Sequence, residues 1–190
     1  MGTVIEFLPA RFCYFCPMVN IHRLVLLLGS NISDRYTYLK DAIVLIEGKI
    51  GAVLKQSSIY ESEPWGFEAS LAFLNQIVVV ETHLQPMEIL SITQMIERSL
   101  GRKPKTGNAY QSRTIDIDLL LYDDLAMKNE ELTIPHPLMH ERMFTLLPLA
   151  EVAPGWIHPV LGKTAEQLLA DCTDTAKVWR FNNGRAHDEI

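Results

Sequence analysis

Apolar residues along the chain follow two spacings, and each spacing predicts one kind of secondary structure. Unbroken or alternating apolar runs are typical of strands that face a core. They occur at residues 24–28, 53–60, 73–81 and 115–122. Apolar residues three or four positions apart indicate a helix with one buried face, and such stretches follow the first and third runs. Their apolar positions are Tyr36, Leu39, Ile43 and Ile46 in the first helix, and Ile89, Ile92, Ile96 and Leu100 in the second.

The order of these elements is strand, helix, strand, strand, helix, strand. This order is typical of an α+β fold with a ferredoxin-like βαββαβ core, in which helices cover one face of a four-stranded antiparallel sheet. Helical spacing returns near residues 139–151 and 164–170, so we expect C-terminal additions to this core. We expect one domain over 20–180, a non-catalytic N-terminal extension over 1–19 and a polar tail over 181–190.

Composition narrows the classes of protein to which the chain can belong. Its 190 residues are 48% hydrophobic and 21% charged, which is typical of a globular domain. No stretch approaches the roughly 18 consecutive apolar residues that span a membrane. The net charge of −6 argues against nucleic acid or an anionic membrane as the main partner, because both require a basic surface. Three cysteines form no disulfide framework, so we expect a cytoplasmic protein.

Two carboxylates stand at alternate positions of the last predicted strand. Because side chains alternate along a strand, its apolar residues are expected to face the core: Ile115, Ile117, Leu119 and Leu121. Asp116 and Asp118 would then share the opposite face, with Cα atoms about 6.6 Å apart. Two such charges repel each other unless a cation lies between them. A pair of Mg²⁺ ions that bridge substrate phosphates fits this spacing, and an ordinary solvent-facing strand is the alternative.

Basic residues gather just before this pair of aspartates, in a chain that is otherwise acidic. They are Arg102, Lys103, Lys105 and Arg113. Positive charge beside metal-binding carboxylates suits phosphoryl transfer, because phosphoryl oxygens carry the charge of both the ground state and the transition state. A solvated charged loop is the alternative. The chain has no Walker A motif and no glycine-rich kinase loop, so a nucleotide site here would be of another design.

Seven short motifs occur in one order along the chain. They are Gly29-Ser30-Asn31, Ser57-Ser58-x-Tyr60-x-Ser62-x-Pro64-x-Gly66, Phe73-Leu74-Asn75, Gln94-x-x-Glu97, Arg113-Thr114-Ile115-Asp116-Ile117-Asp118, Ile134-Pro135-His136-Pro137 and Arg142-x-Phe144. Together they resemble the 6-hydroxymethyl-7,8-dihydropterin pyrophosphokinase family of folate biosynthesis, over about residues 24–169. The resemblance implies a ferredoxin-like core, two Mg²⁺ ions and ATP as co-substrate. It also implies transfer of the β,γ-diphosphate to the pterin hydroxymethyl group with release of AMP. We infer no obligate protein partner.

The resemblance also implies roles for individual residues. The catalytic residues would be Arg102, Arg113, Asp116 and Asp118, and the two aspartates would be the metal ligands. The ATP-binding residues would be Gln94, Glu97, Arg102, Lys105, Arg113, His136 and Arg142. The pterin-binding residues would be Ser62, Glu63, Trp65, Phe73, Asn75, Asp116 and Phe144. Of these, Phe144 would stack on the flat ring and Asn75 would hydrogen-bond the ring edge.

Two other functions are compatible with parts of the pattern. Nucleotidyltransferases also combine Gly-Ser with Asp-x-Asp, but in them the two motifs lie close together, whereas here they lie far apart in the sequence. A ferredoxin-like binding module, for RNA or for a small molecule, is the non-catalytic alternative. The acidic net charge and the absence of an aromatic RNA-binding strand motif both argue against this alternative. The reaction products separate the three functions: AMP, free pyrophosphate, or no turnover.

Overall fold

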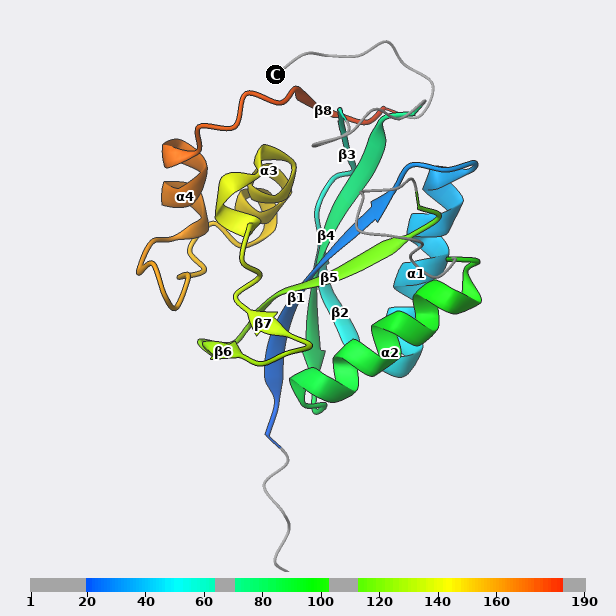
Figure 1. Ribbon diagram of the computed structural model, residues 1–190, viewed down its shortest axis with the longest axis horizontal. Helices are drawn as coiled ribbons and strands as arrows, with labels where there is room; N and C mark the ends of the chain where they lie inside the picture. The colour runs from blue at the N-terminus through cyan, green and yellow to red at the C-terminus, as the bar shows by residue number, and fades with distance from the viewer. Residues whose placement is uncertain (1–19, 64–70, 103–112, 183–190) are drawn as a thin grey trace, which may run out of the picture.

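The computed structural model describes residues 20–63, 71–102 and 113–182, and in this part of the chain six strands form one sheet (Figure 1). The strands are β1 (His22–Ser30), β2 (Ala52–Gln56), β3 (Tyr60–Ser62), β4 (Phe73–Thr82), β5 (Asp116–Tyr122) and β8 (Val178–Arg180). β1 lies between β5 and β4, and both pairings are antiparallel. β2 and β3 pair with successive parts of β4, and β8 pairs with β3. A separate hairpin joins β6 (Met127–Lys128) to β7 (Thr133–Ile134).

The sheet therefore has six strands where four were predicted. The single strand expected over 53–60 is two strands, β2 and β3. The ladder is interrupted at Ser57, whose hydroxyl accepts the Ile77 N–H at 3.0 Å in place of a backbone carbonyl. The Ser57 carbonyl instead accepts from the Gln76 side chain at 2.8 Å. β8 was not predicted, because three residues are too few to show a spacing.

Helices cover both faces of this sheet (Figure 1). α1 (Arg35–Lys49) and α2 (Pro86–Ser99) lie on one face, as predicted for the two amphipathic helices. α3 (Met143–Val152) and α4 (Ala165–Asp171) are the expected C-terminal additions, and they cover the opposite face. β1 shows the consequence, because Leu24, Leu26 and Leu28 belong to the α1–α2 core while Val25 and Leu27 belong to the α3–α4 core. None of the described helices is long and apolar enough to cross a membrane.

Local signals set where the two predicted helices begin. Asp34 caps α1, because its side chain accepts the Thr37 N–H at 3.2 Å. α2 begins with Pro86 after a reciprocal capping arrangement of Gln85 and Glu88. Arg35 is therefore the first residue of α1, at the end nearest the C-terminus of β1.

One side chain of β5 lies on the unexpected face. Ile115, Ile117 and Leu119 belong to the α1–α2 core, as predicted. Leu121 was predicted to join them, but it packs in the α3–α4 core. The reason is a β-bulge: Val25 pairs with Leu121 and the next residue, Leu26, pairs with Leu119. The extra residue, Leu120, reverses the alternation beyond it. Asp116 and Asp118 precede the bulge, so they keep the predicted face, opposite Ile117.

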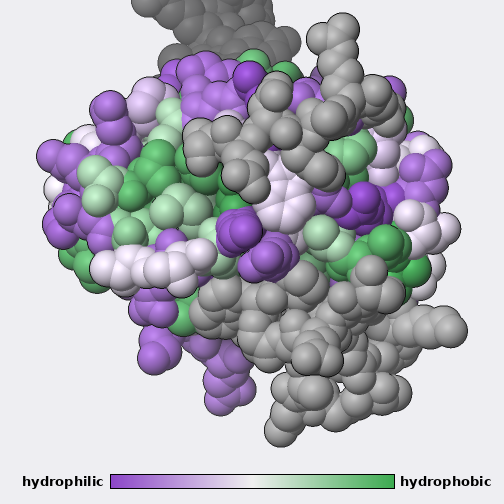
Figure 2. All heavy atoms as spheres, turned by 90° about the horizontal axis from the view of Figure 1, so that it is seen from above, coloured by the Kyte–Doolittle hydropathy of each residue, from purple (hydrophilic) through white to green (hydrophobic). Residues whose placement is uncertain are grey.

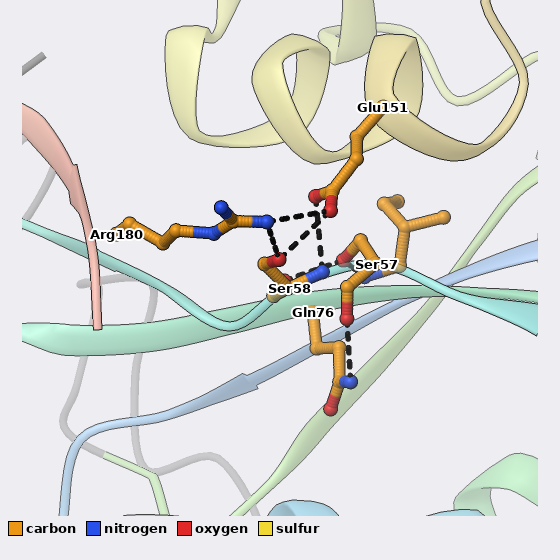
Figure 3. A network of polar contacts seen from close by, with 6 residues as sticks. Ser57, Ser58, Gln76, Glu151 and Arg180 are labelled. Atoms are coloured by element: carbon orange, nitrogen blue, oxygen red, sulfur yellow. Dashed lines mark hydrogen bonds and ion pairs between the residues drawn. The ribbon is translucent and has the colours of Figure 1, made fainter. Parts of the chain in front are cut away.

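Polar contacts fasten α3 and β8 to the segment between β2 and β3 (Figure 3). The carboxylate of Glu151, in α3, accepts the Ser58 N–H at 2.9 Å and the Ser58 hydroxyl at 2.8 Å. Arg180, in β8, donates to the same carboxylate at 3.1 Å and also to the Ser58 hydroxyl. A helix and a strand from the C-terminal part of the chain are thus tied to one point of the sheet.

Candidate functional site

Most of the predicted site residues lie at one end of the sheet, on the face that α3 covers. Three positions form a row across neighbouring strands, because Gly29 pairs with Asp116 on one side and with Asn75 on the other. A Cβ atom added to Gly29 would lie 3.6 Å from the Asn75 Oδ1 atom and 3.9 Å from the Phe73 ring. Glycine therefore leaves the floor of the site free of a side chain between a carboxylate and an amide. Figure 2 looks onto the end of the molecule where β3 and β8 lie, which carries both hydrophilic and hydrophobic patches.

Arginines surround the carboxylate end of this row. Asp116 Oδ1 accepts from Arg102 Nη1 at 2.7 Å, and the other Asp116 oxygen pairs with Arg113. Arg102 also pairs with Glu97, near the end of α2. Glu97 Oε1 in turn accepts the Ile117 N–H at 2.8 Å, which fastens α2 to the edge of β5. The structure therefore brings together four residues, Glu97, Arg102, Arg113 and Asp116, that were expected to act in catalysis or ATP binding.

Burial disfavours the charged forms of two acidic groups in this cluster. Burial, and then the charge of Asp116, raise the pKa of Asp118 to about 7. The same two causes, in the same order, raise the pKa of Glu97 to about 7. Arg142 and Arg113 act in the opposite direction on Asp118, but they do not compensate fully. A divalent cation at the aspartates would stabilise their charged forms.

The donor set suits Mg²⁺, because Asp116 and Asp118 offer carboxylate oxygens from one face of one strand. Within residues 20–63, 71–102 and 113–182, no three His, Cys, Asp or Glu side chains form a metal-binding group. Mg²⁺ commonly takes only one or two protein carboxylates and completes its shell with water and substrate phosphates. The two aspartates fit that pattern.

The side chains expected at the nucleotide lie on several elements. His136 follows β7, and its Nδ1 accepts the Leu138 N–H at 3.3 Å, so Nε2 carries the proton in the neutral ring. Burial, and then nearby Arg142, lower the pKa of His136 to about 4, which keeps the ring neutral near pH 7. Arg142 is buried and lies just before α3. Gln94 is exposed on α2, one turn before Glu97.

The side chains expected at the pterin lie on β3, β4 and α3. Asn75 Nδ2 donates to Ser62 Oγ at 2.9 Å, and both residues are buried, so the amide is held in one orientation. Phe73 pairs with Ser62 across the two strands. Phe144 is in α3, and the Arg142 guanidinium lies 5.6 Å from the centre of its ring. Glu63 is exposed just beyond β3. Trp65 and Lys105 lie outside the described residues.

Sequence reasoning did not assign roles to two residues, Asn31 and Glu61, that support neighbouring segments of the site. Asn31 Oδ1 accepts the Arg113 N–H at 2.7 Å, and the Asn31 N–H donates to the Arg113 carbonyl at 3.1 Å, so the two backbones are joined. Glu61 is buried in β3 and pairs with Arg35. Glu61 directly follows the strand predicted over 53–60, and no sequence pattern names its partner.

A pair of carboxylates on one strand, ringed by arginines, is the kind of site that a phosphotransferase uses. Comparisons with known proteins agree. Residues 25–154 match the family model described as 7,8-dihydro-6-hydroxymethylpterin-pyrophosphokinase. The chain belongs to this family of folate-pathway pyrophosphokinases.

Individual relatives show how far the similarity extends. The chain is 46% identical over 134 residues to the 2-amino-4-hydroxy-6-hydroxymethyldihydropteridine pyrophosphokinase of Porphyromonas gingivalis, covering 70% of this chain and 90% of the relative. It is 46% identical over 126 residues to that of Bacillus subtilis, covering 66% and 74% respectively. A Plasmodium falciparum HPPK-DHPS crystal structure has a TM-score of 0.68 at 19% identity, covering 82% of this chain and 45% of that longer one. This last likeness concerns the fold alone.

Proposed function

We propose that this chain transfers the β,γ-diphosphate of ATP to the hydroxymethyl group of 6-hydroxymethyl-7,8-dihydropterin. The pterin oxygen forms a bond to the β-phosphorus, the bond from that phosphorus to the oxygen of the α-phosphate breaks, and AMP leaves. The hydroxyl proton is released. The observation that carries the proposal is the row Asp116–Gly29–Asn75. The Asp116 carboxylate, which we assign to the phosphates, and the Asn75 amide, which we assign to the pterin, lie on either side of Gly29, which has no side chain.

The pterin is assigned to the β3, β4 and α3 side of this row. The ring would stack on Phe144 and contact Phe73, while the oriented Asn75 amide and Ser62 hydrogen-bond its polar edge. Glu63 and Trp65 would complete this side, and Asp116 would lie near the hydroxymethyl group. The number of fixed polar groups is small, as expected for a site that selects one ring by its edge.

ATP is assigned to the α2 and β7 side. Glu97 and Gln94 would contact the nucleoside, and neutral His136 would donate a hydrogen bond from Nε2. Arg142, Arg102, Arg113 and Lys105 would contact phosphate oxygens. Arg102 and Arg113 already converge on Asp116, so they stand where charge builds up during transfer. These two arginines are therefore the catalytic cations of the proposal.

Asp116 and Asp118 would hold two Mg²⁺ ions. When bound there, such ions would supply positive charge at the phosphates and would make the attacking hydroxyl more acidic. The residues of the chain supply the rest: they bind the two substrates, align the hydroxyl with the β-phosphorus and exclude water. Alignment matters here because a primary hydroxyl is a weak nucleophile.

The finer description of the fold and setting is also a proposal. If β2 and β3 count as one interrupted strand, the order from β5 to β1, β4 and the interrupted strand matches a ferredoxin-like core, with β8 as an addition. A single catalytic domain over 20–180 is supported by the family match and by α4 and β8, which lie beyond it. We place the enzyme in the cytoplasm and assign it no obligate protein partner.

The test is to incubate the protein with ATP, Mg²⁺ and 6-hydroxymethyl-7,8-dihydropterin and to quantify the products. The proposal requires AMP and the pterin diphosphate in equal amounts. Free pyrophosphate would indicate a nucleotidyltransferase, and no turnover would indicate a binding module; either result contradicts the proposal. Omission of Mg²⁺ is the matched control and should abolish product formation.

A further inference from the structure

A buried ion pair lies behind the proposed pterin side of the site. Arg35 Nη1 donates to Glu61 Oε1 at 2.6 Å, and Glu61 is only 7% exposed. Arg35 opens α1 and Glu61 is in β3, so the pair joins a helix to the sheet. Buried charges of this kind are costly unless both partners are satisfied, so the contact requires a specific geometry.

The same guanidinium nitrogen also reaches the neighbouring strand. Arg35 Nη1 donates to the carbonyl of Ala72 at 2.6 Å, and Ala72 directly precedes β4. Glu61 directly precedes Ser62, and Ala72 directly precedes Phe73. Since Ser62 and Phe73 pair across β3 and β4, one cation holds both strands at their shared end.

The second oxygen of the Glu61 carboxylate is also bound. Trp179, in β8, donates from Nε1 to Glu61 Oε2 at 3.0 Å. Its backbone pairs with that of Glu61 in the sheet. The carboxylate thus accepts from α1 through one oxygen and from β8 through the other, which leaves it little freedom to rotate.

This cluster and the pterin side occupy opposite faces of the same strands. Glu61 pairs with Leu74, and Leu74 belongs to the α1–α2 core. Because side chains alternate, Ser62, Phe73 and Asn75 face the α3 side. Arg35 therefore cannot touch a substrate bound on that side, and any effect it has must pass through the backbone of β3 and β4.

We propose that Arg35, through Glu61 and Ala72, is a positioning residue that fixes the spacing of Ser62, Phe73 and Asn75 for the pterin ring. This inference rests on the proposed function. It assigns to Arg35 an effect on pterin affinity and not on ATP affinity, because no residue assigned to ATP lies on β3 or β4, the two strands that Arg35 holds. A merely structural ion pair would alter thermal stability and leave both affinities unchanged well below the melting temperature.

The main variant is the double substitution Arg35→Met with Glu61→Gln. Removing Arg35 alone would strand a buried carboxylate, which commonly costs several kcal/mol and threatens folding. The double substitution removes both charges and keeps similar side-chain volumes. Arg35→Lys keeps the charge without the planar fork, and Trp179→Phe removes only one donor to Glu61. These two single variants keep the inference testable if the double variant does not fold.

Steady-state kinetics of AMP formation should show a rise of about tenfold or more in the pterin KM of the double variant. The ATP KM should change by less than about twofold. Arg35→Lys and Trp179→Phe should give smaller rises with the same selectivity for pterin. Arg23→Met, at an exposed position near the other end of β1, is the matched arginine control and should behave as wild type. Ile46→Ala, a cavity in the core under α1, supplies a destabilised control with unaltered affinities.

Two results would overturn the inference. One is an unchanged pterin KM in a double variant whose melting temperature falls as far as that of Ile46→Ala. The other is an equal rise in the KM of both substrates. If instead the wild-type protein forms no AMP, the proposed function fails first, and the comparison of variants is not reached.

Discussion

Asp116 and Asp118 are two residues apart on one strand, yet their surroundings differ. Asp116 forms direct ion pairs with Arg102 and Arg113, whereas burial raises the pKa of Asp118 to about 7. A carboxylate held by two guanidinium groups stabilises the fold, and under the proposed function it would serve the chemistry as well. A carboxylate whose charge is disfavoured by burial would serve the proposed chemistry at the expense of the fold. Substitutions of Asp116 and of Asp118 should therefore have different effects on the stability of the fold.

Asp118→Asn is predicted to abolish turnover while preserving the fold. It removes a proposed metal ligand with little change in side-chain volume, so kcat should fall by about a hundredfold or more, equivalent to about 2.7 kcal/mol in the barrier. The melting temperature without Mg²⁺ should stay level or rise, because a disfavoured charge is gone. Asp116→Asn should lose activity and also melt earlier, since Arg102 and Arg113 lose their partner. An Asp118→Asn enzyme with more than about a tenth of wild-type kcat would refute the metal assignment.

His158 is predicted to make the fold sensitive to mild acid. Burial, and then the neighbouring His140, lower its pKa. Its Nδ1 accepts the N–H groups of Val160 and Leu161 at 3.3 and 3.2 Å, so a proton on Nδ1 would break both contacts. The unfolded chain binds the proton near the ordinary pKa of about 6.5 and the folded chain binds it less readily. Stability is therefore complete above about pH 6.5 and is lost as the pH falls below that value.

Thermal unfolding at about pH 7.5 and pH 5.5 tests this residue. His158→Asn offers an uncharged acceptor at the same place, so its melting temperature should fall less between the two pH values than that of the wild type. His83→Asn, at an exposed histidine, should keep the wild-type difference. Equal differences for wild type and His158→Asn would show that another group carries the acid sensitivity.

At the scale of elements, α3 connects the site to the C-terminal part of the chain. Arg142 and Phe144 lie at its beginning, and Glu151 lies near its end. Glu151 binds Ser58 and Arg180, and its charge, after burial, raises the pKa of Tyr60. Tyr60 pairs with Asn75 across β3 and β4. The attachment of α3 is therefore adjacent to the strands that carry the pterin side.

Glu151→Gln is predicted to loosen this attachment. The amide keeps one acceptor oxygen, but its NH₂ group faces the Ser58 donors, so about 1 kcal/mol of unfolding free energy should be lost. For a domain of this size the melting temperature should fall by about 2–4 °C. Glu47→Gln makes the same chemical change at an exposed position of α1 and should leave the melting temperature unchanged. If both variants melt like the wild type, the Glu151 contacts do not stabilise the fold.

The spacing of apolar residues predicted an element and its buried face correctly where the residues of that element alone determine them. The alternation in β5 placed Asp116 and Asp118 on one face, and the spacing in α1 and α2 gave both helices. The structure differs from the prediction where pairing with a second segment of the chain determines the local structure. Leu121 changes face because β1 pairs with β5 across a bulge, and β8 forms because β3 has a free edge.

The site shows the same division. The proximity of Arg113 to Asp116 was predictable because the two residues are close neighbours in the sequence. The ion pair of Arg35 with Glu61 was not predictable, because it depends on how α1 packs on β3. Asn31 stood in a recognised motif, but its contact with the Arg113 backbone appears only when β1 and β5 are adjacent.

At the scale of the whole molecule, residues 1–17 are predicted to be dispensable. The family match begins at residue 25, and β1 begins at His22. A chain starting at Met18 should match the full chain in kcat/KM and, within about 2 °C, in melting temperature. Parallel thermal unfolding and AMP-release assays on the two chains check this. A drop of several degrees would show that the N-terminal residues pack on the domain.

The position of β8 determines when the site can form during synthesis. β3 pairs with β4 on one side and with β8 on the other, and Trp179 reaches back over 118 positions to Glu61. A ribosome that has made the chain through β5 has therefore produced every residue that we propose as catalytic, but not the strand that pairs with the outer edge of β3. Until residue 180 emerges, the outer edge of β3 exposes unpaired backbone groups, and such edges invite pairing with other chains. Premature termination before β8 would thus yield a chain with an intact catalytic sequence, an unsupported pterin side and an edge prone to aggregation.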